Sequence, residues 1–118
     1  MSPINFEDLA KKHPKHRNAL RKLEEWMRRH EDVRVIYPTM LAKEVRGEID
    51  PTALALALAL LVKVGLLRRA YKVTTPSGVL ADGEFEDPTK IPPKLPDRFE
   101  RYFDTAESDV VPIFHMVA

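Results

Sequence analysis

The clearest hydrophobic pattern of the chain lies between residues 14 and 30. Apolar side chains recur there every three or four residues, and charged side chains fill most of the positions between them. This spacing places the apolar residues on one side of an α-helix, where they can cover a core. Pro14 suits the first turn, because the N–H that proline lacks has no partner there. We predict an amphipathic helix whose apolar side carries Ala19, Leu20, Leu23, Trp26, Met27 and His30.

A second apolar stretch, residues 50–65, reads DPTALALALALLVKVG, and its leucines alternate with alanines. Alternation with a period of two is typical of a half-buried strand, yet Ala and Leu are strong helix formers. The ends of the stretch favour the helix. Asp50 is a good N-cap, Pro51 fits the first helical position, and Gly65 suits the residue just past the end. We therefore predict a helix here.

The leucines of this helix fall on two faces. At about 100° per residue, Leu54, Leu58 and Leu61 share one stripe, which we expect to face the core. Leu56 and Leu60 lie roughly opposite. The helix is therefore apolar on more than one side, and its second face needs an explanation.

The rest of the N-terminal half contains shorter signals. Asn5 can cap a helix that runs through Lys12. The β-branched run at residues 33–37 predicts one strand, and Pro38 ends it. Thr39 is then the predicted N-cap of a short helix that Gly47 closes.

The C-terminal half reads as strands and extended chain. Residues 66–74 and 79–85 predict the two arms of a hairpin, because Pro76, Ser77 and Gly78 between them are turn residues. Residues 86–96 are proline-rich and predict extended chain. Asp97 is a predicted cap for a helical turn or two through residue 104, and residues 110–117 are apolar and predicted to be extended.

This order of elements resembles the winged helix-turn-helix superfamily, over about residues 15–85. The resemblance rests on YPTMLAKEV (37–45), IDPTALALALALLVKVGLLRR (49–69) and the hairpin AYKVTTPSGVLADG (70–83). The linker between the two motif helices looks a residue or two longer than is usual in the family. The resemblance implies a helix (residues 51–64) that lies in the DNA major groove and a wing that touches the backbone or minor groove.

The outer face of that helix argues against reading DNA bases. Discrimination in the major groove needs donors and acceptors, and only Thr52 and Lys63 on this face supply them. Three interpretations remain open: cover by a C-terminal part of the same chain, a protein interface, or DNA reading. The segments that can cover the face contain Ile91, Leu95, Phe99, Tyr102, Phe103, Val110, Ile113 and Phe114. The interface, if it is one, consists of Ala55, Leu56, Ala59 and Leu60.

The formal net charge of +1 hides an uneven distribution. Residues 1–30 carry eight Lys/Arg against four Asp/Glu, whereas residues 81–118 carry four against nine. Basic side chains can contact phosphates without reading sequence, or they can simply be solvated. The wing turn TTPSG has no basic residue at its tip, which weakens the case for DNA. The candidates for phosphate contacts are Lys15, Arg17, Arg21, Lys63, Arg68, Arg69 and Lys72.

Chemistry that would mark an enzyme is missing from the sequence pattern. The chain has no cysteine, which excludes disulfides, a thiol nucleophile and a cysteine-based zinc site. Each of its four glycines is explained by a turn or a helix end, so no phosphate-binding loop is indicated. His13 and His16 can share a helical face, but the other two histidines, His30 and His115, are distant in sequence, so surface histidines are favoured over a metal site. The acidic residues 82–87 lack the spacing of an EF-hand. We expect no catalytic residue, no cofactor and no metal.

Together these patterns predict an α+β fold: a winged-helix domain over residues 1–87, with a β-hairpin wing, and a proline-rich C-terminal extension over 88–118 that packs on it or mediates contacts. The function we expect is a non-enzymatic protein–protein interaction adaptor or assembly subunit, in the cytoplasm of a microbe. Its partner would be another protein or a second copy of the chain, with no membrane involved. The alternative is a DNA-binding transcriptional regulator that uses the basic first helices and the wing.

Overall fold

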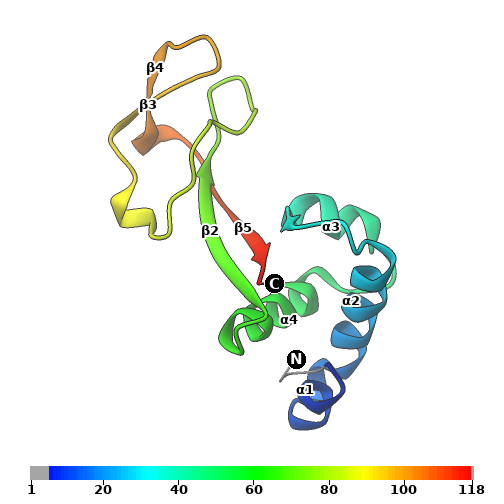
Figure 1. Cartoon of the computed structure of the whole chain (residues 1–118). Coiled ribbons are helices and arrows are strands. Elements are labelled where there is room, and N and C mark those ends of the chain that lie inside the picture. The colour runs from blue at the N-terminus through cyan, green and yellow to red at the C-terminus, as the bar shows by residue number, and fades with distance from the viewer. Residues whose placement is uncertain (1–5, 118) are drawn as a thin grey trace. The chain divides into compact units, whose positions relative to one another are not determined.

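The computed structural model describes residues 6–117, and Cα packing divides the chain into two compact units. In the described chain, the first unit comprises residues 6–68 and 115–117, and the second comprises residues 69–114. Two long strands, β2 (Leu67–Val73) and β5 (Val110–Met116), carry the chain from the first unit to the second and back (Figure 1). The units are defined by packing, so the predicted domain boundary after Asp87 stays a prediction.

Helices make up most of the first unit. They are α1 (Phe6–Lys12), α2 (Arg17–Arg29), α3 (Pro38–Glu44) and α4 (Pro51–Lys63), with a 3₁₀ turn, η1 (Pro14–His16), before α2. The predicted first helix is thus present, while its predicted cap, Asn5, lies outside the described residues. None of the helices in residues 6–117 has both the length and the apolar content that a membrane span requires.

Helix α2 supplies one wall of the core. Ala19, Leu20, Leu23 and Trp26 are buried along one side of it, as the spacing predicts. The imidazole Nδ1 of His30, just past the last turn, lies 2.8 Å from the carbonyl oxygen of Trp26. Because a carbonyl only accepts, this nitrogen carries the proton, and it satisfies a carbonyl that the helix end leaves without a partner.

A small sheet completes the first unit. The end of β5 lies between β1 (Val35–Ile36) and the start of β2. The backbone N–H of Met116 donates to the carbonyl of Arg34 at 2.8 Å, and that of Val117 donates to Leu66 at 3.1 Å. The predicted strand at 33–37 is therefore present but shorter, and the predicted extended run at 110–117 is a strand.

Helix α3 begins earlier than its sequence suggests. Thr39 was the expected N-cap, but Pro38 is already helical and Tyr37 holds the cap position without a side-chain hydrogen bond. Proline at the first helical position costs no hydrogen bond, so the helix can start directly after β1. The Thr39 prediction is wrong for this reason. Gly47, at φ 85°, follows in the turn after the helix rather than closing it.

In the second unit, β2 leads into a turn through Pro76 and Gly78, as predicted, but the returning arm is not a continuous strand. It pairs at two isolated bridges, Tyr71 of β2 with Phe85 and Thr74, just past β2, with Leu80. Five residue steps along this arm face three along β2, so the ladder must bulge between the bridges. The bulge contains Gly83 at φ 94°, a backbone conformation that glycine adopts without strain.

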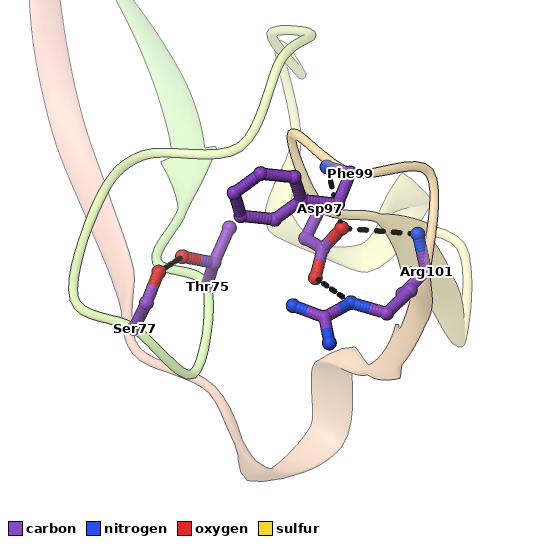
Figure 2. A network of polar contacts seen from close by, with 5 residues as sticks. All are labelled: Thr75, Ser77, Asp97, Phe99 and Arg101. Carbon is purple, nitrogen blue, oxygen red and sulfur yellow. Dashed lines mark hydrogen bonds and ion pairs between the residues drawn. The ribbon is translucent and has the colours of Figure 1, made fainter.

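The remainder of the second unit is a hairpin of β3 (Lys94–Pro96) and β4 (Tyr102–Asp104), with 3₁₀ turns η2 (Pro88–Lys90) and η3 (Thr105–Glu107) on either side. A helical segment after Asp97 was expected, and this prediction is wrong. The Asp97 carboxylate does accept backbone N–H groups, but it closes the β3–β4 turn instead (Figure 2). The same capping chemistry serves helix starts and tight turns.

The described chain therefore mixes helices with small sheets, and its class is α+β as predicted. Fully buried side chains of the first unit include Leu20, Leu23, Leu41 and Leu61. In the second unit, Ala70, Val73 and Ala81 are among the few buried apolar residues. Most of the buried apolar side chains thus belong to the first unit.

Candidate functional site

Helix α4 is fixed at both ends by local hydrogen bonds. The Asp50 carboxylate accepts the N–H groups of Thr52 at 3.0 Å and Ala53 at 3.2 Å, which confirms the predicted N-cap. At the other end, Gly65 has φ 85° and donates to Val62, while the next N–H reaches back to Leu61. This pair of bonds is a Schellman motif, and it needs a left-handed residue at the glycine position.

One face of α4 belongs to the core. Leu54, Ala57, Leu58 and Leu61 are buried, and the helix contacts α2 and η1. The predicted inward stripe is confirmed. These four side chains form the core-facing side of the helix.

The opposite face of α4 remains apolar and accessible. Leu56 exposes 48% of its surface, and Ala55 is exposed beside it. Ala59 and Leu60 are half-buried on the following turn. The expectation that Leu56 faces outward is confirmed, whereas its use as an interface stays a prediction.

One turn after Leu56, Leu60 lines a groove between α1 and α4 that has a volume of about 400 Å³. Its apolar lining comes from Leu9, Leu60 and Val64. Polar side chains complete the lining: Asp8, Lys12, His13 and Lys63. We call Ala55, Leu56, Ala59, Leu60 and this groove the α4 surface. It combines an apolar floor with a predominantly basic edge.

The side chains predicted to contact phosphates do not all share one environment. In the first unit, Lys15, Arg17, Arg21, Lys63 and Arg68 are exposed. In the second unit, the Nζ of Lys72 donates to the Ala81 carbonyl at 3.4 Å. Arg69 is half-buried, its Nε has no hydrogen-bond partner within the described chain, and its guanidinium lies 5.5 Å from the ring centre of Phe114. Lys72 and Arg69 thus make contacts with other residues of the second unit.

Acidic neighbours moderate the basic character of the first helices. A second groove, of about 430 Å³ between α1 and α2, is lined by Lys11, Arg17 and Arg21 but also by Glu7 and Glu24. Ion pairs join Lys11 to Glu7 at 3.9 Å and Arg28 to Glu24 at 3.5 Å. Exposed pairs of this kind add little stability, but they reduce the positive potential of the surface.

One feature of the first unit was missed by sequence reasoning. Trp26 donates its indole N–H to Glu44 at 2.6 Å and stacks on His30 with ring centres 4.3 Å apart. With Tyr37 and Met40, these residues line a pocket of about 160 Å³. The signal available in the sequence was Met40, an apolar residue among the polar residues of α3. In the structure its side chain is 63% exposed.

Within the described residues, no three His, Asp or Glu side chains come together as metal ligands. The rings of His13 and His16 are 6.5 Å apart, and Asp87 caps η2 by accepting the N–H of Thr89. This hydrogen bond lowers the pKa of Asp87 below its usual value. The backbone N–H of Arg101 lowers the pKa of Asp97 in the same way.

The α4 surface is thus the best candidate site of the first unit, since it joins exposed apolar residues, a groove and a charged edge. No family model, curated protein or solved structure matches the chain.

Proposed function

We propose that the chain is a non-enzymatic protein-docking module, an adaptor or assembly subunit, and that the α4 surface is where its partner binds. The observation that carries this proposal is the exposure of Leu56 in the middle of a helix whose core stripe is already complete. Fully burying a leucine contributes about 1.5–3 kcal/mol. Exposed apolar side chains that adjoin a groove are a common mark of protein interfaces.

The chemistry of the groove indicates what kind of segment it takes. Leu56 and Leu60 are four residues apart, so they form one apolar ridge along α4. The ridge leads to a groove edged by Lys12 and Lys63, with the acidic Asp8 also present. An amphipathic partner helix with leucine-like anchors and acidic flanks would match both properties. We therefore commit to an acidic amphipathic segment of another protein as the occupant.

The first unit itself is proposed to be a winged-helix domain, with α3 and α4 as its motif helices. The order α2, β1, α3, α4, β2 supports this, as does the position of the β5 end between β1 and β2. In this proposal β5 is the returning wing strand, and residues 74–109 form a much enlarged wing. The apolar α4 surface replaces the polar side chains that base reading requires.

The test uses the full chain and a fluorescent probe peptide of about 18 residues, with leucines at helical spacing flanked by glutamates. We expect saturable anisotropy binding, at least tenfold weaker for Leu56→Lys. Met40→Lys is the matched control, because it places the same charge at an exposed apolar position of α3. A second probe with lysines in place of the glutamates is expected to bind more weakly to the wild type.

Three outcomes would overturn the proposal. The first is equal loss of binding in Leu56→Lys and Met40→Lys. The second is a stable dimer in light scattering that Leu56→Lys dissociates, which would make a second copy the occupant. The third is tight binding of random duplex DNA that weakens steeply with salt and with Lys15→Gln and Arg17→Gln, which would support the alternative of a DNA-binding regulator.

A further inference from the structure

The turn between β3 and β4, residues 97–101, and the first residue of β4, Tyr102, present two aromatic rings to solvent. Phe99 is 63% exposed and Tyr102 is 71% exposed, the largest values for big apolar side chains in the second unit. Neither ring contributes much to a core, and a hairpin turn can be built without them. We call residues 97–102 the aromatic tip.

The backbone of the aromatic tip is held by Asp97. Its carboxylate accepts the N–H of Phe99 at 2.8 Å and that of Arg101 at 3.0 Å, and the Arg101 Nε lies 3.4 Å from the other oxygen (Figure 2). The backbone N–H of Asp97 also donates to the carbonyl of Arg101 at 2.8 Å, and the Asp97 carbonyl accepts the N–H of Glu100 at 2.9 Å. Glu100 has φ 61°, a left-handed conformation that a side chain adopts at some cost. The tip is therefore ordered before any partner arrives.

Two guanidinium groups accompany the Phe99 ring. Arg98 lies 5.0 Å and Arg101 5.2 Å from its centre, within cation–π range. These contacts restrain the ring and keep positive charge beside it while most of the ring stays in water. An exposed ring with adjacent guanidiniums matches two parts of a nucleotide, the face of the base and the phosphate.

We propose that the aromatic tip binds single-stranded nucleic acid, with bases stacking on Phe99 and Tyr102 and with Arg98 and Arg101 contacting phosphates. This activity is separate from the proposed docking at the α4 surface and does not depend on it. The bases of a single strand expose their faces, whereas those of a duplex are already stacked on one another. Single strands are therefore the form that the tip selects.

The charge of the second unit sets how this binding should depend on salt. Residues 69–114 carry nine Asp/Glu against six Lys/Arg, so the unit as a whole does not attract polyanions. Within the tip, Arg98 and Arg101 are matched by Asp97 and Glu100, so the tip has no net charge. Screening over about 8 Å at physiological salt therefore limits the electrostatic contribution to the direct phosphate contacts of the two guanidiniums. Two phosphate contacts predict a slope of only about −1.4 in log K against log salt. Stacking should thus carry most of the affinity.

The experiment titrates the full chain with fluorescein-labelled 12-mers of deoxythymidine or uridine, and with the same deoxythymidine strand annealed to its complement. We expect micromolar binding of both single strands, at least tenfold weaker binding of the duplex, and the shallow salt slope. Phe99→Leu keeps an apolar side chain but removes the π-face, and should weaken binding roughly 5- to 150-fold. Phe99→Tyr keeps an aromatic ring and should bind about as well as the wild type.

Lys90→Gln is the matched control, since it removes an exposed positive charge of the same unit outside the tip and should change binding less than twofold. Amide shifts in a heteronuclear NMR titration should be confined to residues near 97–102. The proposal is overturned if Phe99→Leu binds as well as the wild type, or if duplex and single strand bind alike. It is also overturned if no strand binds below about 100 µM at low salt, which would assign the exposed rings to a protein contact instead.

Discussion

Helices α2 and α4 are equally long, thirteen residues each, and each buries four side chains in the first unit. They differ on the side that faces away from the core. The outer side of α2 is dominated by Lys, Arg and Glu, as the sequence RNALRKLEEWMRR shows. The outer side of α4 carries Ala55 and Leu56.

This difference shows which part of α4 the fold explains. Four buried residues are enough to hold α2, so four are enough for α4 as well, and the fold does not require its remaining leucines. A polar outer face would also keep the helix more soluble. The proposed docking function would account for this excess apolar surface. If the proposal holds, substitutions on the buried faces of α2 and α4 should have similar effects, whereas substitutions on their outer faces should differ in their effect on binding.

The largest loss of stability is expected from substitutions on the buried faces of α2 and α4. Leu61→Ala in α4 and Leu23→Ala in α2 each remove a fully buried side chain, and each should lower the free energy of unfolding by about 2–5 kcal/mol. Alanine preserves helix propensity, so the loss reports packing rather than helix formation. Urea unfolding followed by circular dichroism measures it. A loss below 1 kcal/mol for Leu61→Ala alone would show that α4 is not part of the core in the way that α2 is.

A smaller loss of stability is expected from substitutions at the N-caps of the two helices. Asp50→Ala removes an N-cap that accepts two backbone N–H groups, and should cost about 1 kcal/mol. His16 holds the corresponding position of α2 without a side-chain cap bond, so His16→Ala should cost distinctly less. Thermal unfolding of the two variants compares them directly. Equal losses would mean that the Asp50 hydrogen bonds do not stabilise α4.

The sequence predicted α2 and α4 well because their signals are local. A helical repeat of apolar residues identified α2, and Asp50, Pro51 and Gly65 identified α4 against its misleading period of two. The inward stripe of α4 followed from helix geometry alone. The outward direction of Leu56 followed from the same geometry, whereas the sequence left open whether another segment of the chain covers it.

The C-terminal half was predicted less well because its signals are ambiguous. Asp97 can cap a helix or close a turn, and only the pairing of Lys94–Pro96 with Tyr102–Asp104 decides between them. The arm at residues 79–85 has strand-like composition, but its bulge follows from tertiary register. The partner strand of β2, β5, lies about forty residues further along the chain, a pairing that no local pattern specifies.

The smallest effect on stability is expected where the two helices differ most. Leu56→Glu gives α4 the polar outer face that α2 already has, and glutamate forms helices about as well as leucine. Because the Leu56 side chain is already half in water, the free energy of unfolding should change by less than about 0.5 kcal/mol. Binding of the acidic probe peptide should nevertheless fall further than with Leu56→Lys, because glutamate removes the anchor and also repels the peptide's carboxylates. Urea unfolding and probe anisotropy on the same samples separate the two effects. If Leu56→Glu instead unfolded the chain, Leu56 would be a core residue after all, and the contrast between α2 and α4 would lose its functional meaning.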